Sequence, residues 1–402
     1  MMKVQMVNDI LCRLRSVLPN TDTQIVLHEP DFDGSECVFI KECLDRRWVS
    51  SVGGFVERFE ADLALYTGVK HVIATVNGTA ALHICLLVAG VEPGDEVLVP
   101  ALTFVATANA VSYCGGIPHL VDCSEETLGM DPTKLESYLQ DVAEIRPDGC
   151  WNRMSGRRVK ALVPIHTFGH PVDLDPLAEL CRRYKLQLIE DAAEALGSFY
   201  KGRHTGNWGK LSALSFNGNK IVTTGGGGAI LTNDDELARM ARHLTTVAKL
   251  PHPWKFVHDQ IGYNYRMPNL NAALGIAQLQ RLPDLLRLKR ELASAYHKAF
   301  DGAQGYRCFK EPPFARSNYW LNALILDESF ADCFDELLER TNREGIMTRP
   351  FWTPLHQLEM YKHCPRMDLS VAESLAVRTV NLPSSSFLGG YHGEGQDLCG
   401  HR

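Results

Sequence analysis

Short apolar runs alternate with helical stretches along the chain from about residue 55 onward. The runs are HVIATV (71–76), EVLVP (96–100), PHLVD (118–122), VKALVPI (159–165), LQLIED (186–191), LSALSF (211–216) and GAILT (228–232). Segments with a helical pattern separate several of them, such as DLDPLAELCRRYK (173–185). Apolar strands that alternate with helices are typical of a mainly parallel sheet covered on both faces. The pattern therefore predicts an α/β fold with a mainly parallel, seven-stranded sheet sandwiched by helices.

Two segments of different character flank this sheet region. We expect an N-terminal arm and helix over residues 1–54, a large α/β domain over 55–280 and a smaller C-terminal α+β domain over 281–402. A long helical region, 270–300, joins the two domains, and Pro283 is expected to interrupt it. The end of the chain, 387–402, is rich in glycine and histidine and is expected to be loose.

The composition excludes several classes of protein. The chain has 402 residues, of which 45% are hydrophobic and 22% charged, as in ordinary globular proteins. The net charge of −7 and the lack of a basic block argue against nucleic-acid or anionic-membrane partners. The twelve cysteines are scattered without a C-x-x-C pair, which predicts reduced thiols and no metal site. With no apolar run near the roughly 18 residues of a membrane span, we expect a cytoplasmic protein.

Chemistry in such a fold is expected just beyond the carboxyl ends of the strands. After the first strand, NGTAAL (77–82) begins a helix at Gly78 and Thr79, whose backbone N–H groups suit a phosphate or simply need a cap. After the second strand, Phe104 is either a core residue or a ring on which a flat cofactor stacks. His166 follows another strand, and we expect it to be a hydrogen-bonded structural histidine.

Two ionisable residues stand out at the same edge. Asp191 ends a buried strand, where a carboxylate needs a cation or hydrogen-bond donors. It is either the cap of a helix over AAEAL or a partner for a protonated ring nitrogen, and Glu194 lies close enough to share its pocket. Lys220 follows the strand that Ser215 ends, in a polar corner before four glycines. It is either an ordinary loop lysine or an amine nucleophile.

Together these residues match the requirements of a pyridoxal 5′-phosphate site. The amine of Lys220 would form the imine, a carboxylate would keep the pyridine nitrogen protonated, and backbone amides would hold the phosphate. The glycines 225–228 would then let the chain turn sharply after Lys220 and return close beneath the cofactor. A tight turn with no ligand nearby is the alternative for these glycines.

Seven segments in order resemble the DegT/DnrJ/EryC1/StrS sugar aminotransferases, over roughly residues 25–385. They are VSSVGGFVERFEADLALYTG, VNGTAALH, PGDEVLVPALTFVATANAV, IEDAAEALGS, SFNGNKIVTTGGGGAI, IGYNYRMPNLNAALGIAQLQ and PLHQLEMY. The resemblance implies a fold-type I, pyridoxal-phosphate-dependent aminotransferase.

The resemblance also implies a role for each matching residue. Lys220 would carry the cofactor and move the proton between the cofactor and the sugar carbon. Asp191 would pair with the pyridine nitrogen, and Glu194 would contact the phenolic oxygen, where many relatives have glutamine. Phe104 would stack on the ring. The remaining cofactor ligands would be Gly78, Thr79 and Ser215 at the phosphate, together with Asn264 of YNYR, which would reach the neighbouring subunit's cofactor in a homodimer with shared active sites.

The subgroup that the segments resemble most aminates C4 of nucleotide-linked 4-keto-6-deoxy sugars. This implies a nucleotide-sugar substrate, UDP-linked and N-acetylated, with L-glutamate as amino donor and 2-oxoglutarate as its product, in bacterial surface-glycan or nonulosonic acid biosynthesis. Arg266, His356 and Trp254 are candidates for substrate binding, the arginine through a diphosphate. The alternatives are a GDP-perosamine-type 4-aminotransferase, a 3-keto-sugar aminotransferase, a dehydratase and a catalytically silent sensor. Some relatives replace the lysine with histidine and become dehydratases, so the presence of Lys220 favours transamination.

Overall fold

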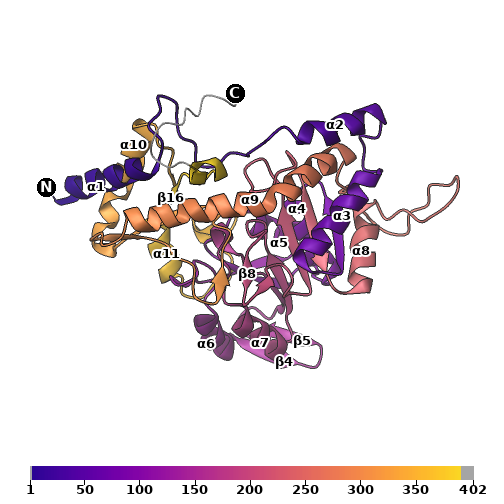
Figure 1. Cartoon of the computed structure of the whole chain (residues 1–402). Helices are drawn as coiled ribbons and strands as arrows, with labels where there is room; N and C mark the ends of the chain where they lie inside the picture. Colours follow the sequence, from indigo (N-terminus) through magenta and orange to yellow (C-terminus); the bar gives the residue numbers. More distant parts are fainter. Residues whose placement is uncertain (1, 391–402) are drawn as a thin grey trace.

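The computed structural model describes residues 2–390, which are arranged around one large mixed sheet (Figure 1). Its main path contains all seven expected strands, and the prediction of a mainly parallel, helix-covered sheet is confirmed. In spatial order the strands are β1 (His71–Thr75), β11 (Gly228–Thr232), β10 (Leu211–Ser215), β7 (Gln187–Asp191), β6 (Arg158–Leu162), β2 (Glu96–Pro100) and β3 (Ile117–Val121).

One strand of this path, β11, runs against both of its neighbours, β10 and β1. Parallel neighbours need a crossover connection, usually a helix. The connection from β10 to β11, residues 216–227, contains no helix, and the chain therefore returns antiparallel. This return is the segment that carries Lys220 and the glycines.

A hairpin that the sequence analysis missed extends the sheet. Strands β4 (Ala143–Arg146) and β5 (Gly149–Asn152) pair antiparallel, and β5 pairs with β6. Both strands are four residues long. In β5 only Cys150 and Asn152 are buried. A short hairpin with one solvent-exposed face lacks the continuous apolar run from which the buried strands were predicted.

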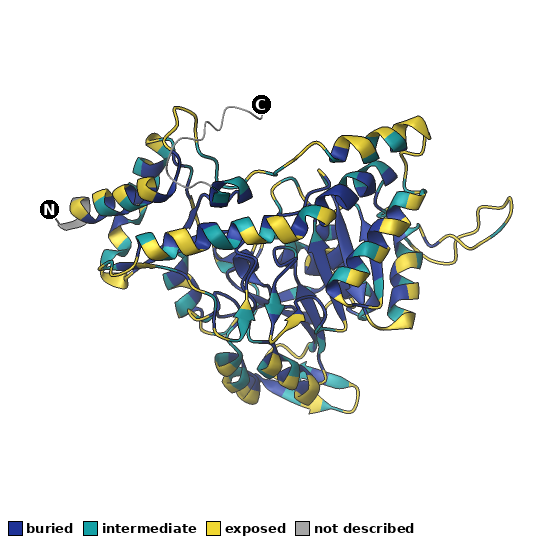
Figure 2. Ribbon diagram, in the orientation of Figure 1, coloured by how far each residue is buried: buried dark blue, intermediate teal, exposed yellow. Residues whose placement is uncertain are grey.

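Helices α3 (Gly54–Thr67), α4 (Gly78–Val88), α5 (Ala106–Tyr113), α6 (Pro132–Val142), α7 (Leu174–Tyr184) and α8 (Asp235–Thr245) cover the sheet. Helix α4 packs on β10 and β11, whereas α3 and α8 pack on β1. Figure 2 shows the strands as a buried layer between helices with exposed outer faces. Most residues of α4 are buried, so the start of this helix is held firmly against the sheet edge.

The long helix α9 (Asn269–Ala299) runs across the molecule, from α2 (Glu36–Asp45) and α3 to α1 (Met2–Val17) (Figure 1). The expectation that Pro283 interrupts it is wrong, because the helix continues through the proline. A proline removes one backbone hydrogen bond. Buried neighbours on both sides of it, Leu282 and Leu285, anchor this stretch in the core, and such tertiary packing supplies most helical stability.

Among residues 2–390, the structure contains no helix that is both long enough and apolar enough to span a membrane.

A smaller four-stranded sheet follows α9. It consists of β12 (Tyr306–Cys308), β14 (Asn322–Leu326), β16 (Thr379–Leu382) and β15 (Arg349–Pro350), with α10 (Phe334–Arg343) and α11 (Ser370–Ala376) nearby in the sequence. Helix α1 shares a buried cluster with this part, because Ile10 and Leu14 pack with Tyr296 and Leu324. A third sheet joins β13 (Ala315–Arg316), β8 (Phe199–Tyr200) and β9 (Arg203–His204). The domain boundaries stay a prediction, and the part of the expected loose end beyond Gly390 lies outside the described residues.

Candidate active site

A tight backbone cradle lies where β1, β10 and β11 meet. Gly228 is paired with both Thr75 and Ser215. A Cβ atom on Gly228 would lie 2.5 Å from the carbonyl carbon of Asn77 and 2.7 Å from the backbone nitrogen of Gly78. A Cβ atom on Gly78 would lie 2.9 Å from that of Ser215. Only glycine allows this close approach, which brings the start of α4 against the ends of two strands.

The start of α4 offers free backbone donors to an anion. Asn77 caps the helix, and its Oδ1 accepts the backbone N–H of Ala80 at 2.7 Å. The backbone N–H of Ala81 donates to the Asn77 carbonyl at 3.2 Å. Since the first N–H groups of a helix have no intrahelical acceptor, those of Gly78 and Thr79 point toward whatever lies beyond the helix end. This geometry and the helix dipole suit a phosphate group.

Lys220 lies in the connection between β10 and β11, with its side chain only 13% exposed. Its backbone N–H donates to Asn217 O at 3.0 Å, and Gly225 makes the following turn with φ of 75°. The Nζ atom is 3.4 Å from Glu194 Oε1. On another side it lies 3.7 Å from the ring centroid of Trp320. The amine is thus held at a fixed, partly desolvated point, as the nucleophile interpretation requires.

Glu194 is buried beside this amine. Its Oε2 accepts the backbone N–H of Phe168 at 2.8 Å. Burial raises the pKa of the Glu194 carboxyl to about 7, although the neighbouring charge of Lys220 opposes the rise. The carboxyl is therefore poised to exchange a proton near neutral pH.

Asp191, at the end of β7, is also buried. One carboxylate oxygen accepts the hydroxyl of Thr107 at 2.6 Å, and the other accepts the backbone N–H of Ala193 at 3.2 Å. Burial raises the pKa of this carboxyl. The segment that follows forms turns and not the helix that the capping interpretation assumed. A cationic group placed at Asp191 would relieve the cost of burying its charge.

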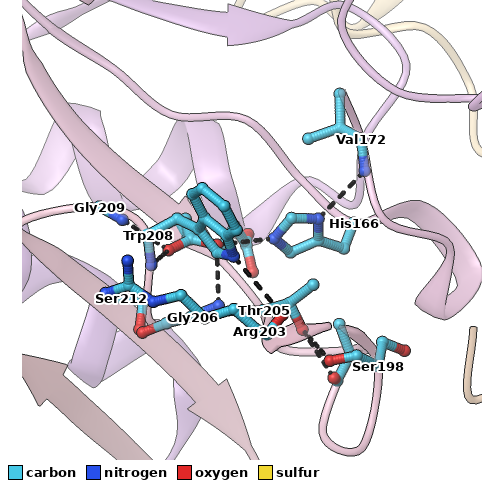
Figure 3. A network of polar contacts seen from close by, with 12 residues as sticks. His166, Val172, Ser198, Arg203, Thr205, Gly206, Trp208, Gly209 and Ser212 are labelled. Atoms are coloured by element: carbon cyan, nitrogen blue, oxygen red, sulfur yellow. Dashed lines mark hydrogen bonds and ion pairs between the residues drawn. The ribbon is translucent and has the colours of Figure 1, made fainter. Parts of the chain in front are cut away.

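A network behind Asp191 fixes the end of β7 (Figure 3). The buried carboxylate of Glu190 accepts the backbone N–H groups of Gly206, Trp208 and Gly209 at 2.7–2.8 Å. It also accepts Nε2–H of His166 at 3.0 Å, while His166 Nδ1 accepts the backbone N–H of Val172 at 3.3 Å. His166 is fully buried and has both nitrogens engaged, which confirms the expected structural histidine.

A cavity of about 750 Å³ opens next to this group of residues. Phe104 lines it and is 52% exposed, so it is not a core residue. Asn219 and Trp320 line it on the side of Lys220. Arg349 is the cationic residue of the lining. The cavity thus joins the amine to a space large enough for a sizeable ligand.

The remaining sequence candidates lie in different settings. The Arg266 guanidinium is nearly buried and ion-paired with Glu60, so the structure gives no support for a diphosphate ligand there. His356 Nε2 is 2.9 Å from Glu373 Oε1. Trp254 is 78% exposed on the 246–262 loop, and Asn264 is exposed where that loop ends. The roles of His356, Trp254 and Asn264 stay predictions.

Sequence reasoning missed two residues of the site. Thr107 lies three positions after Phe104, and this spacing places both near the start of α5. The spacing was the only feature of the sequence that could have identified Thr107 as a site residue. Trp320 appeared as part of an apolar run before β14, and nothing in its neighbourhood distinguished it from a core residue. Its place against Lys220 depends on how the segment after α9 packs on the large sheet.

Comparison with known proteins matches this geometry to a family. The DegT/DnrJ/EryC1/StrS aminotransferase family matches residues 31–392. The chain belongs to this family. It is 40% identical to a GDP-perosamine synthase of Caulobacter vibrioides, over 91% of this chain and 94% of the relative. It is 36% identical to a GDP-perosamine synthase of Escherichia coli O157:H7, over 90% of this chain and 93% of the relative.

The fold has solved counterparts among sugar aminotransferases. The PLP form of the putative sugar aminotransferase Spr1654 from Streptococcus pneumoniae superposes with a TM-score of 0.81 at 25% identity, covering 90% of this chain and 93% of that one. The chain is accordingly an aminotransferase that uses pyridoxal 5′-phosphate. The residues described above fit the cofactor, since they combine an anion cradle, a buried carboxylate without a cation and a confined amine.

Proposed function

We propose that this enzyme transfers an amino group from L-glutamate to C4 of a GDP-linked 4-keto-6-deoxy sugar. The observation that carries the chemistry is the meeting of Lys220, Glu194 and Asp191 beside the glycine cradle. For the nucleotide, the resemblance favours UDP, whereas both relatives named above are GDP-perosamine synthases. We therefore give preference to the GDP-linked sugar over the UDP-linked, N-acetylated one.

In this proposal each side chain has one task at the cofactor. When bound, the cofactor supplies an electron sink for the carbon that gains or loses the amino group. Asp191, whose carboxylate accepts the hydroxyl of Thr107, would accept the ring N–H. The backbone N–H groups of Gly78 and Thr79, with the Ser215 hydroxyl, would hold the phosphate. Phe104 offers its exposed face to the ring.

Lys220 is the group that moves the proton. Its amine holds the cofactor between turnovers, and when it is free it can carry a proton to or from the sugar carbon. Glu194 would contact the phenolic oxygen of the cofactor, and burial raises the pKa of its carboxyl to about 7. The cavity wall, which includes Phe104 and Arg349, would face the nucleotide sugar.

The substrate is tested by running the reaction in reverse. GDP-, UDP- and dTDP-linked 4-amino sugars, each with 2-oxoglutarate, are followed by mass for the 4-keto sugar and for glutamate. We expect GDP-perosamine to react at least tenfold faster than the UDP- and dTDP-linked sugars. Preference for an N-acetylated UDP-sugar would refute the nucleotide assignment. Loss of water without glutamate formation would indicate a dehydratase, and no change with any sugar would indicate a sensor.

The proposal includes a homodimer with shared sites. The 246–262 loop projects from the body of the molecule (Figure 1). Its large apolar side chains Trp254, Phe256 and Ile261 are exposed. Such a patch is typical of a surface that another chain covers. Asn264 follows directly and would reach the phosphate site of the partner.

Mixing two inactive variants tests this arrangement. In a heterodimer of Lys220→Ala and Asn264→Ala, one site carries both defects and the other carries neither. Random pairing makes about half of the dimers mixed, so activity should recover to about a quarter of the unmutated level. Each variant mixed with itself is the control. If exchange is proved by mass and activity stays absent, Asn264 serves its own chain.

A further inference from the structure

The amine of Lys220 lies between an aromatic face and a carboxyl. Its Nζ is 3.7 Å from the centroid of Trp320 and 3.4 Å from Glu194 Oε1. We propose that Trp320 and Glu194 form a seat for this amine, which holds it in place whenever it is not bonded to the cofactor. The inference rests on the proposed role of Lys220 as the proton carrier and adds Trp320 to the groups that act in the reaction.

Three hydrogen bonds hold Trp320, one through its ring and two through its backbone. The indole N–H donates to Asn219 O at 2.7 Å, on the residue next to Lys220. The Trp320 backbone N–H donates to Asn318 Oδ1 at 2.8 Å. Its carbonyl accepts a hydrogen bond from the buried Lys289 Nζ at 2.8 Å. The bond to Asn219 ties the ring to the same turn that carries the lysine.

The backbone before Trp320 is strained in a way that serves this placement. Tyr319 has φ of 49°, a left-handed value that costs energy for a bulky residue. The conformation is retained within a dense set of contacts, because Asn318 Nδ2 donates to the carbonyls of Glu194 and Leu196 at 2.8 and 2.9 Å. Asn318 thus links both walls of the seat, the Glu194 loop and the Trp320 ring.

The counterpart wall has the same character. Phe168, whose backbone N–H donates to Glu194, has φ of 55°. A Cβ atom on the next residue, Gly169, would lie 1.8 Å from Asn318 Oδ1. The Leu321 backbone N–H donates to Phe168 O at 3.3 Å and closes the connection between the two walls. Two residues with left-handed backbone and one glycine without room for a Cβ atom therefore position the segments that carry Glu194 and Trp320.

The chemistry of the seat suits a lysine that alternates between two states. An aromatic face attracts an ammonium group through its quadrupole but offers it no lone pair. The Trp320 ring thus holds the amine in position without taking its proton. Glu194, on the other side, can exchange that proton. A lysine without such a seat would have to find its position again in every turnover, and misplacement by about 1 Å can cost on the order of 10² in rate.

The test removes the ring face while Lys220 stays in place. In Trp320→Leu we expect the glutamate half-reaction of the holoenzyme to slow about 10- to 100-fold. The isotope effect with α-deuterated glutamate should rise as proton transfer becomes limiting. Trp320→Phe keeps a face and should lose about 3- to 10-fold. Trp151→Leu, on the distant β4–β5 hairpin, is the matched control and should change neither quantity.

A double-mutant cycle separates this inference from the proposed function. In the Lys220→Ala background, added ethylamine should restore part of the rate. This restored rate should be the same whether position 320 holds Trp or Leu. An equal loss from Trp320→Leu in both backgrounds would show that Trp320 acts on the substrate and would overturn the seat. Full turnover by Lys220→Ala would instead overturn the role of Lys220. If Trp320→Leu fails to retain the cofactor, an unchanged half-reaction in Trp320→Phe overturns the inference.

Discussion

The raised pKa of Glu194 makes the stability of the cofactor-free protein depend on pH in a calculable way. Burial raises the pKa from the ordinary 4.5 to about 7, so between these values the folded chain binds more protons than the unfolded chain. By linkage, this group costs nothing well below pH 4.5, and the free energy of unfolding falls as the pH rises through the two values. At about 1.36 kcal/mol per pKa unit the full cost is about 3 kcal/mol, of which about 2 kcal/mol develops between pH 5 and 7.

Glu194→Gln removes this titration and keeps an amide that can still accept the N–H of Phe168. Urea unfolding of wild type and variant at pH 5, 6 and 7 gives the difference in free energy, in which other titrating groups cancel. We expect the variant to gain about 2 kcal/mol relative to wild type from pH 5 to 7. Glu359→Gln, at an exposed position, is the control for the substitution itself. A difference for Glu194→Gln that stays flat over this range would refute the buried, proton-exchanging carboxyl.

Three further predictions concern the cofactor. Borohydride reduction and peptide mapping should find the pyridoxyl mass on Lys220, and its appearance on another lysine would contradict the assignment. Asp191→Asn should lower turnover on the order of 10² while cofactor binding persists, whereas a near-normal kcat would leave Asp191 as a turn cap only. Gly228→Ala places a methyl 2.5 Å from the Asn77 carbonyl and should lower stability by about 1–3 kcal/mol and weaken cofactor binding in titration. Gly218→Ala, whose nearest contact is 3.9 Å away, should change neither.

The strands of the main sheet could be predicted because their burial on both faces writes a continuous apolar run into the sequence. The β4–β5 hairpin has no such run. Pro283 exposes a second limit, since the rule that proline breaks helices is local. The packing of α9 against α1, α2 and α3 comes from residues distant in the sequence.

The site divides along the same line. Asp191, Lys220 and Gly78 directly follow strands or end them, so chain order alone brings them to one edge of the sheet. Trp320 reaches that edge only through the packing of the smaller part of the chain on the larger. For Arg266 the charge suggested a diphosphate ligand, and the structure pairs it with Glu60, 206 residues away in the sequence. The position of an arginine in the sequence does not reveal which carboxylate it pairs with in the fold.

The segment IEDAAEA carries three buried carboxyl groups, which differ in the number of hydrogen-bond donors around them and in the direction in which their pKa is shifted. Glu190 is buried, yet the hydrogen bond from His166 and the backbone N–H groups around it outweigh the burial and lower its pKa. Asp191 and Glu194 receive fewer donors, and burial raises the pKa of both. Donors that the protein could have supplied to all three are concentrated on the one that faces away from Lys220. The buried carboxyls of Asp191 and Glu194 are poorly compensated by hydrogen-bond donors. A cationic ring beside Asp191 and an amine beside Glu194 would lower the cost of burying them, and transamination requires both groups there.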